Sequence, residues 1–75
     1  MSIHLLEKAG QALYGPRWQT ELARIVGVSD RTMRRWLASP HDIPVGVWRD
    51  IDAALLERGM AIERVRNELA RAMAG

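Results

Sequence analysis

The sequence predicts an all-α fold, a small bundle of about five helices. Apolar residues recur every three or four positions in five separate segments, which is the period of an amphipathic helix. Glycine and proline lie between those segments, and none of the segments has the alternating pattern of a strand. The chain has 75 residues, 48% hydrophobic and 27% charged, which is the length and composition of one packed domain.

A break at Gly15 and Pro16 separates the first two predicted helices. The first covers residues 2–13, and its apolar positions at helical spacing are Ile3, Leu5, Leu6, Ala9, Ala12 and Leu13. The second is short, over residues 17–26, and the side chains expected to face inward are Leu22, Ala23, Ile25 and Val26. Gly27 ends it, because glycine accepts backbone angles that a Cβ disfavours.

The third predicted helix starts at Ser29 and ends near Ala38. Serine is a favourable N-cap, and Asp30 in the first turn interacts favourably with the helix dipole. Met33, Trp36 and Leu37 are expected on its buried side. Residues 39–44 are predicted to be an irregular loop, since they contain two prolines.

Two more helices are predicted in the last third of the chain. Residues 45–58 form the fourth, whose expected buried side chains are Val47, Trp48, Ile51, Ala54 and Leu55. Gly59 is expected to cap this helix or to form a bend. Residues 60–73 form an amphipathic fifth helix, with Ile62, Val65, Leu69 and Met73 on one side.

The segment of residues 19–38 meets the requirements of a helix-turn-helix. Leu22 and Val26 supply an inward stripe on its first helix. Ala23 is small where the second helix has to cross closely, and Gly27 permits the turn. Val28 fills the corner between the two helices, and Met33 and Trp36 anchor the second helix to the core. Because these two side chains face inward, the helical period places an outward face opposite them, made of Asp30, Arg31, Arg34, Arg35 and Ala38. An exposed helix face with three arginines fits the DNA major groove in shape and charge.

The distribution of charge agrees with this prediction. The formal net charge is only +2. Residues 17–35, however, carry five arginines against two acids, whereas residues 49–71 carry five of each. Positive charge is therefore concentrated in the middle third of the chain, and arginine suits bidentate recognition of phosphate and guanine.

The segment resembles the helix-turn-helix of the Xre/Cro/phage-repressor family. The resemblance covers about residues 17–55, because Trp36, the two-proline loop and the run Ile51-Asp52-Ala53-Ala54-Leu55 are similar to that family's closing part. It implies base contacts from Ser29, Asp30, Arg31 and Arg35. It implies phosphate contacts from Gln19, Thr32 and Arg34. Arg17, just before the motif, is expected to contact a phosphate as well. The chain departs from the family at Asp30, where an amide is common; Asp30 either accepts from a cytosine amino group or holds Arg34 in place.

Other classes of function have little support in the sequence. The chain has no cysteine, its two histidines are isolated, and no catalytic constellation is present, so neither an enzyme nor a metal or cofactor site is predicted. The three tryptophans are expected to pack against the protein rather than to stack on nucleic acid: Trp36 and Trp48 in the core, and Trp18 in the core or at its rim. No membrane-spanning stretch or signal peptide is found, so a cytoplasmic location is expected.

Together these features predict a DNA-binding domain over residues 1–58 and an amphipathic helix over residues 59–75. The expected function is sequence-specific binding of double-stranded DNA by a small transcriptional regulator of prokaryotic or phage type, such as a repressor. The alternatives are a protein-interaction module, antitoxin-like or inhibitor-like, and an accessory subunit of a recombination or transposition system. Three alternatives remain for the last helix: it packs on the domain, it forms a homodimer on an inverted-repeat site, or it is a solvated extension.

Overall fold

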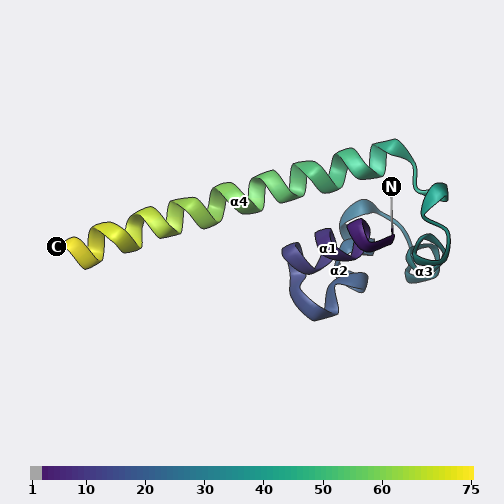
Figure 1. The fold of residues 1–75 in the computed structure, drawn as a ribbon, viewed down its shortest axis with the longest axis horizontal. Coiled ribbons are helices and arrows are strands. Elements are labelled where there is room, and N and C mark those ends of the chain that lie inside the picture. The colour runs from purple at the N-terminus through teal and green to yellow at the C-terminus, as the bar shows by residue number, and fades with distance from the viewer. Residues whose placement is uncertain (1–2) are drawn as a thin grey trace.

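The computed structural model describes residues 3–75, which form four α-helices and two short 3-10 turns (Figure 1). In chain order these are α1 (Ile3–Tyr14), η1 (Gly15–Arg17), α2 (Trp18–Val26), α3 (Asp30–Ala38), η2 (Pro40–Asp42) and α4 (Val45–Ala74). No strand occurs in this part of the chain, so the predicted all-α class is confirmed. The predicted number of about five helices is wrong.

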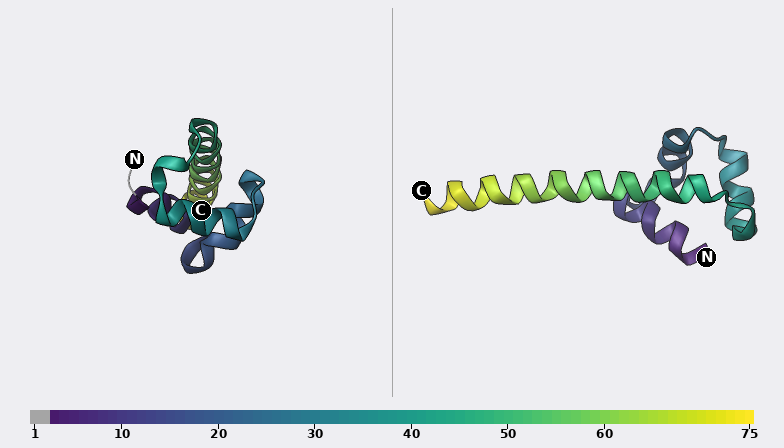
Figure 2. Two further views of the ribbon diagram at one scale, coloured as in Figure 1. Left: turned by 90° about the vertical axis from the view of Figure 1, so that its right-hand side faces the viewer. Right: turned by 90° about the horizontal axis from the view of Figure 1, so that it is seen from above.

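The first three helices gather at one end of the molecule, and α4 extends far beyond them (Figures 1 and 2). The molecule measures 51 × 22 × 20 Å along its principal axes. Its radius of gyration is 15.1 Å, whereas a compact domain of this length has about 11 Å. The chain is therefore a small helical domain with a projecting helix.

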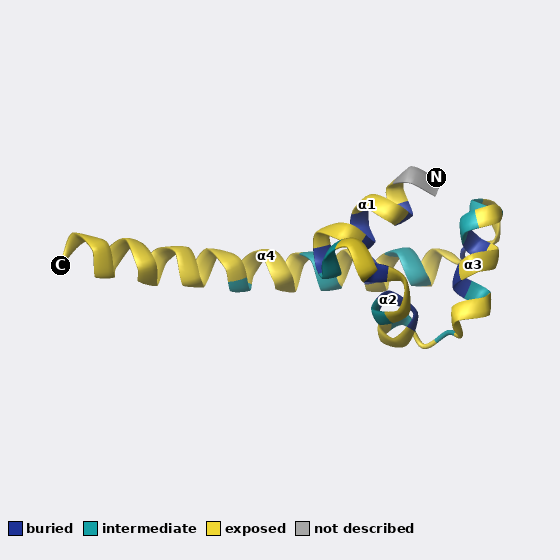
Figure 3. Cartoon of the chain, turned by 90° about the horizontal axis from the view of Figure 1, so that it is seen from below, coloured by how far each residue is buried: buried dark blue, intermediate teal, exposed yellow. Residues whose placement is uncertain are grey.

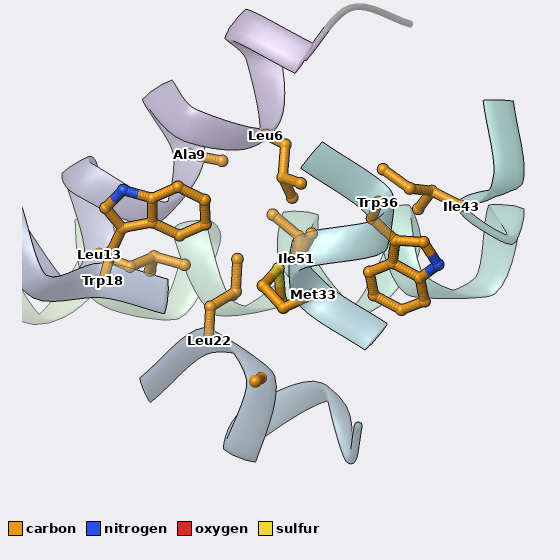
Figure 4. Packing of buried hydrophobic residues seen from close by; sticks show 10 residues of the cluster. Leu6, Ala9, Leu13, Trp18, Leu22, Met33, Trp36, Ile43 and Ile51 are labelled. Atoms are coloured by element: carbon orange, nitrogen blue, oxygen red, sulfur yellow. The ribbon is translucent and has the colours of Figure 1, made fainter. Parts of the chain in front are cut away.

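The core is formed by side chains from every helix and from the loop before α4 (Figure 4). Its members are Leu6, Ala9, Leu13, Trp18, Leu22, Ala23, Met33, Trp36, Ile43 and Ile51. No buried polar or charged residue was found among residues whose burial is described, so the hydrophobic effect holds the domain together. Trp18 and Trp36 are each 3% exposed, which confirms the prediction that they pack in the core.

For the first three helices, the predicted boundaries that fall within the described residues agree with the structure to within one residue. Helix α1 extends to Tyr14, and its predicted start at Ser2 lies outside the described residues. The break after α1 is a 3-10 turn in which Gly15 has a φ of 78°. The loop after α3 contains a turn that was not predicted, η2, which starts at Pro40. Proline suits the first position of a helical turn because its fixed φ is close to the helical value. The backbone N–H that proline lacks would have no acceptor within the turn at that position.

The prediction of separate fourth and fifth helices is wrong, because α4 continues through Gly59 to Ala74. Gly59 does not have a positive φ, and nothing lies within 4 Å of the position its Cβ would take. A glycine inside a helix costs only about 1 kcal/mol relative to alanine. Alanine, glutamate, arginine, leucine and methionine dominate on both sides, and these strong helix formers offset that cost.

Several expected buried positions are more exposed than predicted. Ile25 was expected to face inward, but it is 53% exposed. Trp48, Val47, Ala54 and Leu55 lie against the core but are only partly buried. The buried face of α2 is narrower than predicted, because the core is small. The buried residues of this nine-residue helix are Trp18, Leu22 and Ala23.

Candidate nucleic-acid interface

The turn between α2 and α3 fixes how the two helices follow each other. Gly27 has a φ of 77°, in the left-handed region. The backbone N–H of Gly27 donates to the carbonyl oxygen of Arg24 at 3.2 Å, and that of Val28 donates to the carbonyl oxygen of Ala23 at 2.9 Å. These two bonds form a Schellman motif, which satisfies carbonyl groups at the end of α2. Val28 also packs on the core, so the direction in which α3 begins is well determined.

The first turn of α3 is closed by Ser29 and Thr32. The hydroxyl oxygen of Ser29 accepts a hydrogen bond from the backbone N–H of Thr32 at 3.1 Å, which confirms the predicted N-cap. The Ser29 hydroxyl also donates to the Thr32 hydroxyl oxygen at 3.2 Å. Both predicted contact residues therefore already have a structural role in the free protein. Asp30 follows as the acidic residue of the first turn, which the helix dipole favours.

Helix α3 has one buried face and one basic face. Met33 and Trp36 are buried in the core at 1% and 3% exposure. Successive residues turn by about 100° around a helix, so the direction opposite these two side chains lies among Arg31, Arg34, Arg35 and Ala38. All four residues are exposed.

The three guanidinium groups on this face have no acidic partner in the described part of the chain. The salt bridges there join Glu21 to Arg24 and Glu63 to Arg66, and neither involves α3. Asp30 is exposed and forms no salt bridge with Arg34 in residues 3–75, so the expected positioning of Arg34 by Asp30 is not seen in the free protein. The basic face is therefore available for an anionic partner.

Arg17 and Gln19, the other two predicted contact residues, lie away from α3, at the N-terminal end of α2. Both are exposed, and together with Pro16 and Thr20 they line a shallow surface hollow. Helix α2 is nine residues long, so this end lies about 12 Å along its axis from the turn that leads into α3. Thr20 was not predicted as part of the site; its position next to Gln19 in the first turn of α2 is the signal that identifies it.

The predicted site residues thus form two groups. The first group lies in the first two turns of α3 or at its N-cap: Ser29, Asp30, Arg31, Thr32, Arg34 and Arg35. The second lies at the N-terminal end of α2 and consists of Arg17, its N-cap, and Gln19. Within residues 3–75, no cluster of three or more histidine, cysteine, aspartate or glutamate side chains is suited to hold a metal ion. None of the described helices combines the length and the apolar character needed to cross a membrane.

Comparison of the chain with protein-family models, with curated proteins and with solved structures found no match. Its function has to be inferred from the shape and chemistry of α3 and its surroundings.

Proposed function

We propose that the chain binds double-stranded DNA by inserting α3 into the major groove, with α2, the Gly27 turn and α3 acting as a helix-turn-helix. The observation that carries this proposal is the exposed face of α3. It presents Arg31, Arg34 and Arg35 to solvent without an acidic partner, while Met33 and Trp36 hold its opposite face in the core.

The dimensions of α3 suit this role. The major groove is about 12 Å wide and admits one α-helix. Arg31 and Arg35 lie one turn apart, which places their Cα atoms about 6 Å apart along the helix axis. This separation corresponds to about two base-pair steps of 3.4 Å. Each of the two arginines is proposed to donate two hydrogen bonds to a guanine, the contact by which arginine specifies a base.

The remaining site residues have supporting roles in this proposal. Arg34 and Thr32 contact phosphates beside the groove, and Arg17 and Gln19 contact a phosphate at the start of α2. Asp30 lies at the end of α3 that enters the groove first, where its carboxylate accepts from a cytosine amino group. Ser29 contributes a base contact while its hydroxyl oxygen continues to cap the helix.

The resemblance to the Xre/Cro/phage-repressor family supports the same role. We infer that the protein is a small cytoplasmic transcriptional regulator that acts by occupying its site. Two-fold symmetry of a homodimer would demand an inverted-repeat site.

Selection of binding sites from random duplex DNA tests the proposal. The full chain should enrich one consensus, and its affinity should fall steeply with salt, because arginine–phosphate contacts release counterions. If α3 instead binds a protein, no DNA sequence should be enriched above the level that a variant lacking Arg31, Arg34 and Arg35 gives. That outcome would reject DNA as the specific partner.

A further inference from the structure

Nearly all of α4 beyond the domain is exposed (Figure 3), and its sequence carries an apolar seam. We call residues 59–74 the arm. Ile62, Val65, Leu69 and Met73 are between 52% and 73% exposed. Ile62, Val65 and Leu69 continue a seven-residue repeat that begins in the domain: Trp48, Leu55, Ile62 and Leu69 are seven residues apart, and so are Ile51, Arg58, Val65 and Ala72. Met73 follows Ala72 at the end of this repeat. The seam of the arm is therefore the same helix face that α4 turns toward the core at its base.

The arm gives the chain more surface than a monomer of its size needs. The accessible surface is 5597 Å², whereas a compact 8.5 kDa protein exposes about 4700 Å². The excess of about 900 Å² is close to the area of about 800 Å² that each partner contributes to an interface of standard size. One further chain seated on the arm would account for this excess.

An apolar hollow lies beside the N-terminal part of the same helix, where α4 packs against the domain. Between α1 and α4 there is an open hollow of about 240 Å³, lined by Leu5, Ala9, Trp48, Ile51, Asp52 and Leu55. Leu5 is 45% exposed, and Trp48 and Leu55 are only partly buried. Met73 lies 18 residues after Leu55, a separation of five full turns, so both residues point in the same direction from the helix axis.

We propose that two copies of this chain pair through their arms in antiparallel orientation, so that the end of each arm lies at the α1–α4 hollow of the other copy. A two-fold axis between residues 63 and 64 places Ile62 of each copy opposite Val65 of the other. The same register places Ala72 opposite Leu55 and brings Met73 to the hollow. The pairing covers both the seam and the hollow, and it does not depend on what α3 binds.

Parallel pairing satisfies these features less well. It would place Arg58 beside Arg58 of the second copy within the seam, where two like charges repel each other. Beyond Arg58 it would pair apolar side chains only over residues 62–73, which is 12 residues, whereas the antiparallel register pairs residues 55–72, which is 18. It would also leave the hollow at Leu5 and Trp48 open. In the antiparallel pair Arg58 lies opposite Leu69, and its aliphatic stem can cover that side chain.

Sedimentation of the full chain over a range of concentrations tests the pairing. The wild type should be a dimer at high concentration, and Leu69→Glu should be a monomer whose domain still unfolds cooperatively, with a melting temperature that does not depend on protein concentration. The matched control is Leu56→Glu, because Leu56 is 66% exposed on the same helix but points away from the seam. It should remain a dimer. A wild type that is monomeric at every concentration, or a Leu69→Glu variant that stays dimeric, would overturn the proposal.

The orientation is tested by a distance between labels, which is simple because the chain has no cysteine. A nitroxide label on Ala74→Cys should give a distance of about 30 Å between copies in the antiparallel pair. Parallel arms would bring the same labels close together, since packed helix axes lie about 8–10 Å apart. A short distance would overturn the antiparallel arrangement.

Leu5→Glu gives a third readout, because Leu5 lines the hollow but lies outside the arm. In the antiparallel arrangement this variant should raise the dissociation constant of the dimer at least tenfold. An unchanged dissociation constant would overturn the placement of Met73 in the hollow. DNA binding by a strictly monomeric wild type would leave the proposed function intact and would reject this pairing alone.

Discussion

The indole ring of Trp18, at the start of α2, lies directly against the backbone of α1 at Gly10, which has no side chain to keep the ring away. A Cβ on residue 10 would come within 2.9 Å of Cγ of Trp18 and closer still to Cδ2 and Cε3. Trp18 is 3% exposed and is surrounded by the core, so the ring has no free space into which it can move. The placement of α2, and through it of α3, depends on this contact.

Gly10→Ala should therefore destabilise the domain although alanine favours a helix. Forcing one extra carbon into a packed contact costs about 1–3 kcal/mol, which exceeds the gain of about 0.5–1 kcal/mol from replacing a helical glycine. Thermal unfolding measures the difference, at one protein concentration for all variants. The matched control is Gly59→Ala in the exposed arm, where nothing lies within 4 Å of the added Cβ. It should raise the stability, and a similar gain for Gly10→Ala would refute the close contact.

Gly27→Ala should cost about 1–2 kcal/mol for a different reason. No atom lies within 4 Å of the position of its Cβ, so the added carbon has room. The cost comes from the φ of 77°, which alanine disfavours. Chemical denaturation of Gly27→Ala measures it, and Gly27→Asn should recover part of the loss because asparagine tolerates the left-handed region. Equal stability of the alanine variant and the wild type would show that the turn has another conformation in solution.

Ala23→Leu tests the packing between α2 and its neighbours. Ala23 is 2% exposed, so a larger side chain should cost about 1–3 kcal/mol by overpacking. Ala12→Leu is the control, since Ala12 is exposed on α1 and should tolerate the change. Equal melting temperatures for the two variants would show that residue 23 is not enclosed.

The start of α3 and the turn before it were predictable because each depends on local chemistry. Ser29 caps the helix with its own hydroxyl group, and Gly27 adopts a conformation that few other residues accept. The buried positions Leu22, Met33 and Trp36 follow from helical spacing. The exposed face of Arg31, Arg34 and Arg35 follows from the same spacing, because the positions opposite a buried stripe face solvent.

Other features depend on contacts between distant parts of the chain, and local patterns do not reveal them. Ile43 lies between two prolines in a segment predicted to be an irregular loop, yet it is 7% exposed and closes one side of the core. The spacing of Ile62, Val65 and Leu69 identified an apolar face but not whether the domain covers it. Gly59 suggested a break that does not form, because its strong helix-forming neighbours decide its conformation.

Arg34→Ala should weaken DNA binding to a similar degree for all duplex sequences. Loss of one phosphate contact reduces the slope of log affinity against log salt by about 1. Fluorescence anisotropy at several salt concentrations gives this slope. A control is Arg64→Ala, which removes an exposed arginine from the arm and should leave the slope unchanged. A change of base preference in Arg34→Ala would show that Arg34 contacts a base and not a phosphate.

The most direct test of the central claim is the affinity of Arg35→Ala for a complete set of single-base-pair variants of the selected duplex. If α3 lies in the major groove with Arg35 on a guanine, the variant should lose about 1–3 kcal/mol of discrimination at one base pair and keep the preferences elsewhere. Its thermal melt should match that of the wild type, because Arg35 is exposed and unpaired in residues 3–75. An equal loss of affinity for every duplex, or no loss at all, would contradict the insertion of α3 into the groove with Arg35 as a base contact.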